Sequence, residues 1–309
     1  MPDFDLVVAG ELNPDLILCD PKLEARFGQR EALVEQADLT IGSSSAIFAC
    51  GAARLGLRVA MAGVVGDDLF GRFMQDTLDR RGIDTGAVIV DPQLKTGISV
   101  ILARGADRAI LTYSGAIGAL RAEQVPDPLL QRARHLHVAS YFLQTSLRPG
   151  LPDLLQRARG LGLSISLDTN WDPAQRWEGV KEILPWVDVF LPNEAEAQAI
   201  ACAASLTEAI DRLARLVPML AVKLGGDGAI ARRGDEAVRL RALPVEVADT
   251  VGAGDSFDAG FLYGYLQGWA LARSLGLAVA CGSLSARVLG GTSGQPDLAE
   301  ATRHMDPLA

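Results

Sequence analysis

Short apolar runs recur along the chain, separated by glycines, acidic residues and amides. The runs at residues 6–10, 59–65, 136–139 and 164–167 predict buried strands of a parallel sheet. Helical patterns follow several runs, the clearest after residue 254. This strand–turn–helix order is typical of an α/β fold with a parallel sheet.

Two further stretches have a different pattern. Residues 16–40 contain alternating, β-favouring pieces without a long helical period. Residues 98–103 and 109–113 are rich in β-branched and other apolar residues, and the polar segment 104–108 between them predicts a hairpin turn. These stretches therefore predict β structure outside the strand–turn–helix order.

Length, charge and cysteine content limit the class of protein. The 309 residues suffice for one large α/β domain or two smaller ones. The net charge of −9 argues against nucleic acid or an anionic membrane surface as partner. Four widely separated cysteines argue against a disulfide framework and fit a reduced, cytoplasmic setting. No basic segment at the start suggests a signal peptide, and residues 270–291 predict a buried helix rather than a membrane span.

The most informative stretch is residues 249–255, Asp-Thr-Val-Gly-Ala-Gly-Asp, directly before a helical pattern. Gly252, Ala253 and Gly254 let the backbone approach a ligand, and N–H groups at a helix N-terminus form a seat for an anion. Asp255 could take a proton from a hydroxyl while these groups hold the charge of a phosphoryl group. The alternative is a tight turn in which Asp255 only complements the helix dipole. No Gly-Lys-Ser/Thr follows, so the stretch is not a Walker A loop.

This stretch resembles the Asp-Thr-x-Gly-Ala-Gly-Asp signature of the ribokinase-like (PfkB) family of carbohydrate and nucleoside kinases, and other motifs of that family occur from residue 10 to about 296. The resemblance implies an α/β fold, a three-layer αβα sandwich with a mostly parallel central sheet. It also implies a single kinase domain over residues 1–309, with a small β-sheet lid formed by about 12–40 and 88–115. Such a lid would exclude water, which otherwise hydrolyses the nucleotide.

The resemblance places the acceptor after the first strand and at the start of the first helix. Asn13 and Asp15 match an Asn-x-Asp that holds the sugar, although alone they could build a turn around Pro14. Ser43 replaces the second glycine of the family's first signature, and Ile47 replaces its asparagine. A serine-rich helix cap is the alternative for this segment. The residues expected at the acceptor are Asn13, Asp15, Gly42, Ser43, Ile47, Tyr141, Phe142 and Asp255, where the two aromatic residues could stack on a ring or pack under the lid.

The resemblance also implies a nucleotide site and a metal site. Asn193 and Glu196 match a Pro-Asn-x-x-Glu segment that organises Mg²⁺, usually through water, or they form a helix cap. The residues expected at the nucleotide are Asn193, Lys223, Gly225, Gly226, Gly228, Gly254 and Ala280. A monovalent cation, K⁺, would lie near Asp249, Val251 and Gly291.

The resemblance thus implies an ATP- and Mg²⁺-dependent kinase that phosphorylates a hydroxyl of a sugar or sugar-like molecule, with Asp255 as the base. One alternative is a nucleoside kinase of the adenosine, inosine or cytidine type, which Ile47 and the run 141–143 favour. Another is a non-catalytic nucleotide- or sugar-binding protein. A phosphosugar is disfavoured because no Lys/Arg cluster stands near the acceptor motifs, and Asp172, where sugar-acid kinases carry arginine, disfavours a sugar acid. A homodimer formed through the lid is a further expectation.

Overall fold

Nine strands form the larger of two sheets in the part of the chain that the computed structural model describes, residues 2–25, 27–104 and 107–305. They are β1 (Leu6–Ala9), β4 (Val59–Gly66), β5 (Asp84–Asp91), β8 (His135–Val138), β9 (Ser164–Leu167), β10 (Val189–Phe190), β11 (Met219–Lys223), β12 (Ala229–Arg233) and β13 (Glu236–Leu240). Their order is β13-β12-β11-β10-β9-β8-β1-β4-β5. Neighbours from β5 to β11 are parallel, whereas β12 pairs antiparallel with both β11 and β13. The predicted mostly parallel sheet is confirmed.

Helices cover both faces of this sheet, because successive strand residues point to opposite sides. In β1, Leu6 and Val8 belong to one apolar cluster, and Val7 and Ala9 to the other. The first cluster includes residues of α1 (Ser44–Arg54), α2 (Leu69–Arg80), α8 (Ala253–Leu266), α9 (Leu271–Ser285) and α10 (Leu298–His304). The second includes residues of α3 (Asp127–Leu130), α4 (Leu151–Gly160), α5 (Val180–Ile183), α6 (Glu194–Ala201) and α7 (Leu206–Leu213). These are the three layers that the resemblance implied.

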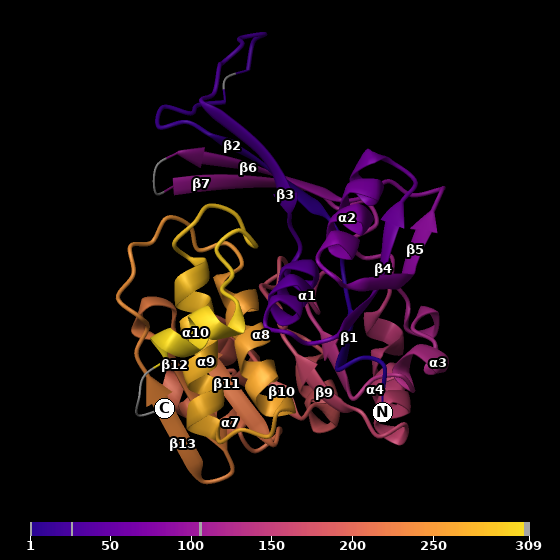
Figure 1. Cartoon of the computed structure of the whole chain (residues 1–309), viewed down its shortest axis with the longest axis vertical. Helices are drawn as coiled ribbons and strands as arrows, with labels where there is room; N and C mark the ends of the chain where they lie inside the picture. Colours follow the sequence, from indigo (N-terminus) through magenta and orange to yellow (C-terminus); the bar gives the residue numbers. More distant parts are fainter. Residues whose placement is uncertain (1, 26, 105–106, 306–309) are drawn as a thin grey trace.

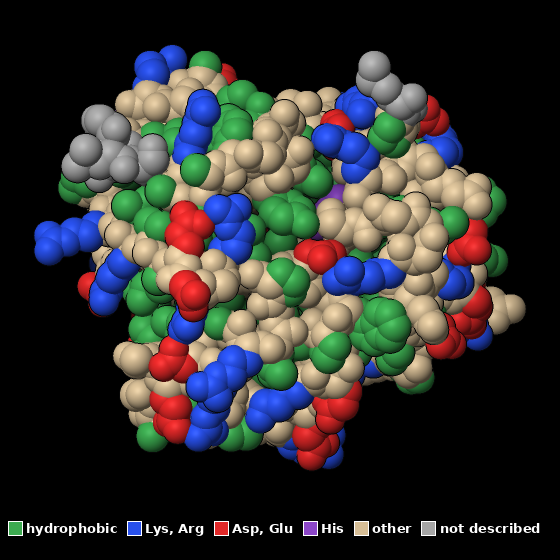
Figure 2. All heavy atoms as spheres, turned by 90° about the horizontal axis from the view of Figure 1, so that it is seen from below, with side chains coloured by type: hydrophobic (Ala, Val, Ile, Leu, Met, Phe, Trp, Pro, Cys, Tyr) green, Lys and Arg blue, Asp and Glu red, His purple; other side chains and the backbone are tan. Residues whose placement is uncertain are grey.

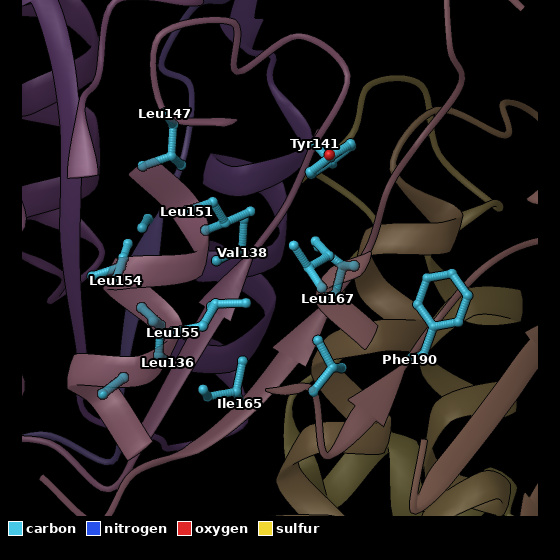
Figure 3. Packing of buried hydrophobic residues seen from close by; sticks show 14 of the residues in the cluster. Leu136, Val138, Tyr141, Leu147, Leu151, Leu154, Leu155, Ile165, Leu167 and Phe190 are labelled. Atoms are coloured by element: carbon cyan, nitrogen blue, oxygen red, sulfur yellow. The ribbon is translucent and has the colours of Figure 1, made fainter. Parts of the chain in front are cut away.

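The packing of α4 on the sheet shows how the second cluster is built (Figure 3). Leu151, Leu154 and Leu155 recur at helical spacing and face Val138 and Ile165 of two neighbouring strands. All five side chains are buried. Each such side chain contributes about 1.5–3 kcal/mol by leaving water, so this cluster fixes the strands whose ends carry the site.

The smaller sheet has the order β3-β2-β6-β7 and projects above the body in Figure 1. It consists of β2 (Pro14–Cys19), β3 (Gln36–Ile41), β6 (Ile98–Arg104) and β7 (Asp107–Tyr113). The strands predicted at 98–103 and 109–113 form the antiparallel pair β6–β7. The turn predicted at 104–108 includes residues 105 and 106, which lie outside the described residues. The expected start of a second lid segment near residue 88 falls inside β5, which pairs with β4 in the larger sheet.

The surface and the helix lengths complete this description. On the face opposite the smaller sheet, acidic and basic side chains are interspersed (Figure 2). Among the described residues, every helix is too short or too polar to cross a membrane. The helix predicted within 270–291 is α9, whose apolar residues pack in the first cluster.

Candidate active site

A cavity of about 920 Å³ lies between the smaller sheet and the carboxyl ends of the parallel strands. Glu11 and Asn13 follow β1, Ser140 follows β8, Asp168 follows β9 and Asn193 follows β10, and all of them line it. Ligands of open parallel sheets bind at this edge, because the loops there converge while the body holds them in place. The underside of β6 and β7 forms the roof of the cavity.

Most of the predicted site residues meet in this cavity. Those that line it are Asn13, Asp15, Ser43, Ile47, Asn193, Glu196, Lys223, Gly225, Gly226, Gly228, Val251, Gly252, Ala253, Gly254 and Asp255. Gly42, Tyr141, Phe142, Asp249, Ala280 and Gly291 lie outside the lining. Gly42 supports the site indirectly, since a Cβ there would lie 2.1 Å from Oδ1 of Asp15.

The two aromatic residues expected at the acceptor pack in the apolar interior instead. Tyr141 and Phe142 are 4% and 6% exposed and belong to the second cluster, where Figure 3 shows Tyr141. Their rings form an edge-to-face pair with centroids 5.1 Å apart, and the Arg148 guanidinium lies over Tyr141. Of this run, only Leu143 reaches the cavity. The structure thus favours the packing role that the sequence left open.

The anion seat is formed by the start of α8. Gly252 is its N-cap with φ 71°, a left-handed conformation that favours glycine. A Cβ at Gly252 would lie 2.6 Å from the carbonyl oxygen of Gly291, so no side chain fits there. The first N–H groups of a helix have no acceptor inside it; here Ala253 N–H donates to the Thr250 carbonyl at 3.3 Å. The remaining N–H groups and the helix dipole favour an anion beside Gly254.

Asp255 lies in the first turn of α8, at the floor of the cavity and 8% exposed. Burial, followed by the charges of Asp168 and Glu11, raises the pKa of its carboxyl to about 8, although Lys223 and a hydrogen bond with Ser44 oppose this shift. No ion pair involving Asp255 was found among the described residues. Its carboxyl therefore faces the cavity as a base whose charged form is only weakly stabilised.

Beside Asp255, Lys223 joins two buried carboxylates. Its Nζ lies 2.9 Å from Asp168 and 3.1 Å from Asp258. Burial would raise the pKa of Asp168, but the Lys223 ammonium and hydrogen bonds hold it below its usual value, whereas burial raises the pKa of Asp258 well above the usual value. The Lys223 ammonium is therefore shared by two buried carboxyl groups whose pKa values shift in opposite directions. A Cβ on Gly254 would lie 3.7 Å from the Lys223 Nζ, so the ammonium adjoins the anion seat.

Asn13 and Asp15 lie at the end of the cavity where the acceptor is expected, here called the acceptor end. Both are almost fully buried. Burial, together with the charge of Asp249, raises the pKa of Asp15 to about 7, although a hydrogen bond with Ser99 and the charge of Arg108 oppose this shift. A carboxylate in such surroundings lacks the hydrogen bonds that water would supply. Asp15 is thus suited to accept hydrogen bonds from the hydroxyls of a ligand.

Glu11 connects the segments that surround the acceptor end by hydrogen bonds. Its carboxylate accepts hydrogen bonds from Ser45 Oγ at 2.5 Å, Ser140 Oγ at 2.8 Å and Gln144 Nε2 at 3.0 Å. Ser140 in turn accepts a bond from Asn170, at 2.8 Å. Ser140 and Asn170 have φ of 53° and 52°, which costs about 1–3 kcal/mol for each non-glycine residue. Such strain persists only where surrounding bonds impose it; Glu11 provides one for Ser140, and Ser140 and Asp168 provide them for Asn170.

Asn193 and Glu196 lie where the nucleotide is expected, here called the nucleotide end of the cavity. They form a capping box at the start of α6. Asn193 N and Nδ2 donate to Glu196 at 2.9 and 2.6 Å, so both side chains are fixed where they line the cavity. Burial, followed by the charge of Asp168, raises the pKa of Glu196 to about 7. Ala280 of α9 does not line the cavity, but Val279 and Gly282 of the same helix do.

Some residues of the cavity were not among those expected at the site from the sequence. Glu11, Ser44, Arg108, Asp168 and Asn170 line the cavity, and Asp258 is paired with Lys223. Two features of the sequence could have indicated some of these residues. Lys223 ends an apolar strand, and a buried lysine requires an acidic partner. Asp258 follows Asp255 by three residues, which places both on one face of a helix. Glu11 and Arg108 had no such local signal.

Comparison with known proteins agrees with this geometry. Residues 3–298 match the family described as "pfkB family carbohydrate kinase". An "uncharacterized sugar kinase" of Archaeoglobus fulgidus is 31% identical over 221 residues, 71% of this chain and 87% of that protein. An "ATP-dependent ribose-1-phosphate kinase" of Halopiger xanaduensis is 30% identical over 90% of both chains. A putative ribokinase II of E. coli, solved with ATP and Mg²⁺, has the same fold, with a TM-score of 0.88 at 22% identity over 97% of this chain and 98% of that one. The chain is therefore a phosphotransferase with an alcohol acceptor and belongs to the pfkB family of carbohydrate kinases.

Proposed function

We propose that the protein transfers the γ-phosphoryl group of ATP to a hydroxyl of an uncharged sugar or sugar-like molecule. The observation that carries this proposal is the position of Asp255. Its buried carboxyl lies between a seat of N–H groups and the polar residues of the acceptor end, in one cavity. A base and an anion seat in this order are what phosphoryl transfer to an alcohol requires.

Each residue then has a defined task. Asn13 and Asp15 hold the acceptor by its hydroxyls, and Asp255 accepts the proton of the reacting one. The N–H groups at Gly252, Ala253 and Gly254 stabilise the charge on the transferred group, as oriented donors do in a cavity that excludes water. The smaller sheet is the lid of a single kinase domain, 1–309, and provides that exclusion.

Mg²⁺ fits the residues at the nucleotide end. Glu196, Asp168 and Asp255 line the cavity, and Lys223 is the cation beside them. The carboxylates outnumber this cation, and carboxylate and amide oxygens are the ligands that Mg²⁺ prefers. Glu196 and Asn193 would hold the ion through water, and the ion would offset charge on the phosphates. K⁺ fits less well, because Asp249 is already bonded to two backbone N–H groups and to Arg108.

The charges at the acceptor end favour an uncharged acceptor. Glu11, Asp15 and Asp255 are acidic. Among the described residues, two cations line the cavity, Arg108 and Lys223, and both are paired with carboxylates. At an effective dielectric constant of about 20, any one of these acids in its ionised form repels a negative charge about 5 Å away on the acceptor by about 3 kcal/mol. We therefore expect kcat/KM for a neutral sugar to exceed that for its phosphorylated form by about 100-fold or more.

Matched pairs of acceptors test this proposal. ADP formation is measured with ribose and ribose 1-phosphate, fructose and fructose 6-phosphate, and glucose and gluconate, each with Mg²⁺ and ATP. Turnover of a neutral member, absent with its anionic partner, is the expected result. A preference for the anionic members would refute the uncharged acceptor, and no ATP consumption with any acceptor would refute the kinase itself.

A nucleoside acceptor is the second candidate. Apolar side chains from several elements line the cavity: Ile47, Ile101, Ile110, Ile117, Leu143 and Trp171. A flat base would bury against them, which a free sugar cannot do. Including adenosine, inosine and cytidine in the same assay separates the two acceptor classes. The third candidate, a non-catalytic binding protein, predicts ligand binding without ADP formation.

The smaller sheet also supports a proposal about assembly. β7 is an edge strand with all seven residues exposed, including Leu111 and Tyr113 at 63% and 56%. Unpaired edge strands readily pair with another chain, so a homodimer through the lid is proposed. Light scattering after size exclusion measures the mass of the assembly, and Leu111→Lys should shift that mass to that of a monomer.

The four free cysteines fit a cytoplasmic location.

A further inference from the structure

Arg108 connects the smaller sheet to the segment that precedes Gly252, the N-cap of α8. It lies on β7, opposite Ala103 of β6, and lines the cavity. Its Nη1 lies 3.1 Å from Oδ1 of Asp249, 141 positions later in the chain. Within the part of the chain that the structure describes, no other side-chain hydrogen bond was found between β7 and residues 241–252.

Asp249 uses both carboxylate oxygens inside the protein. Oδ1 accepts a hydrogen bond from Val251 N–H at 3.0 Å in addition to that from Arg108, and Oδ2 accepts one from Gly290 N–H at 3.0 Å. The Asp249 side chain is only 12% exposed. These bonds tie the turn before Gly252 to the segment at Gly290. The three donors already occupy the carboxylate at which the family resemblance places a monovalent cation.

We propose that Arg108 takes the place of a monovalent cation at Asp249 and thereby couples closure of the smaller sheet to phosphoryl transfer. The coupling rests on the proposed kinase function. The replacement of the cation rests only on the three bonds to Asp249.

A dissolved cation and Arg108 differ in when they can neutralise Asp249. A dissolved ion could neutralise Asp249 whether or not the cavity is covered. Arg108 can do so only when β6 and β7 lie over the cavity, because it is carried by the strand itself. With the smaller sheet lifted, an uncompensated Asp249 would repel the phosphates of a nucleotide nearby. Productive binding of ATP and exclusion of water then occur together.

Arg108→Gln tests the replacement without relying on catalysis. A partly exposed ion pair contributes little to global stability, so the variant should fold. Thermal unfolding is followed in KCl and in tetramethylammonium chloride at equal ionic strength. The wild-type Tm should be the same in both salts. Arg108→Gln should gain a K⁺-dependent rise of about 2 °C, because Oδ1 of Asp249 then lacks its cationic donor and can bind the ion.

Turnover in the same two salts tests the coupling, with any acceptor that the wild-type enzyme uses. Without K⁺, we expect kcat/KM of Arg108→Gln to fall about tenfold and its acceptor-independent ATP hydrolysis to rise. Arg108→Lys should remain independent of K⁺. Arg104→Gln is the matched control, since Arg104 lies on the same hairpin, pairs with Asp107 at 3.4 Å and does not line the cavity.

Two results would overturn the proposal. One is a wild-type protein whose Tm or turnover depends on K⁺ as strongly as that of Arg108→Gln. The other is an Arg108→Gln protein that shows no K⁺ dependence in either measurement. If the wild-type protein consumes no ATP, the kinase proposal fails, but the salt dependence of Tm still decides whether Arg108 replaces the cation.

Discussion

Replacing Asp255 by asparagine should remove catalysis and stabilise the fold at the same time. Asp255→Asn keeps the size of the side chain but cannot accept the hydroxyl proton, and loss of a general base costs about 10² to 10⁴ in rate. Nucleotide binding should persist, because the N–H groups at the start of α8 are unchanged.

The gain in stability follows from burial of Asp255. An aspartate has a pKa of about 3.9 in an unfolded chain, and burial raises the pKa of Asp255 in the folded protein to about 8. Between these values the folded state binds more protons than the unfolded state, so stability falls as pH rises. At pH 7 the difference of about three units corresponds to about 4 kcal/mol. The buried amide that the substitution introduces would lose about 1–3 kcal/mol of this, which leaves a net gain of about 2 kcal/mol.

Urea unfolding from pH 4 to 8 measures this gain, and ADP formation measures the loss of rate. Near pH 4 the variant should be less stable by about 1–3 kcal/mol, the cost of its buried amide. The two proteins should be equally stable at about pH 5.5, and the variant should be increasingly more stable from there up to pH 8. For the wild-type enzyme, kcat/KM should rise with pH towards about 8 as Asp255 ionises. Asp76→Asn, an exposed change in α2, is the control and should alter neither quantity. Wild-type turnover by Asp255→Asn, or a variant less stable than wild type at pH 7, would refute the reasoning.

Two further predictions concern the residues around the anion seat. Lys223→Met leaves two buried aspartates without their cation and should lower the free energy of unfolding by about 3–5 kcal/mol in urea. Arg72→Met, which breaks a mostly exposed ion pair, should cost less than about 1 kcal/mol, and similar losses for both would contradict the buried role. Gly252→Ala places a Cβ 2.6 Å from the Gly291 carbonyl at a positive φ, and should abolish ATP turnover and lower Tm. Gly160→Ala, with nothing within 4 Å of the new Cβ, should leave both unchanged; an active Gly252→Ala protein would show that the seat tolerates a side chain.

The fold was predictable where the pattern of residues is local. The apolar run that became β8 and the alternating residues of β6 and β7 identified their strands directly. The sheet to which β5 belongs was not predictable, because a strand with partly exposed residues looks alike in either sheet. Only its pairing with β4 decides this, and pairing depends on contacts between distant parts of the chain.

The residues of the site also divide into those that the local sequence reveals and those that depend on distant contacts. Gly252 and Asp255 are the N-cap and a first-turn residue of one helix, so the sequence of that turn predicted them. Tyr141 is buried outside the cavity lining, whereas Leu143 lines the cavity; which residue of a run faces the cavity depends on how the chain leaves β8. Arg108 became recognisable only once β7 was placed above the cavity.

The contacts that the sequence could not reveal explain how the site tolerates its own instability. Asp255 and Asp15 are buried acids with raised pKa values, and Ser140 and Asn170 hold strained backbone angles. Each of these features costs free energy. Distant contacts oppose them: Glu11 is bonded to Ser140, which also contacts Asn170, and the two apolar clusters hold the strand ends in place. If that support is what maintains the strain, the free energy of unfolding and the rate should fall together when Glu11 is replaced, but move in opposite directions when Asp255 is.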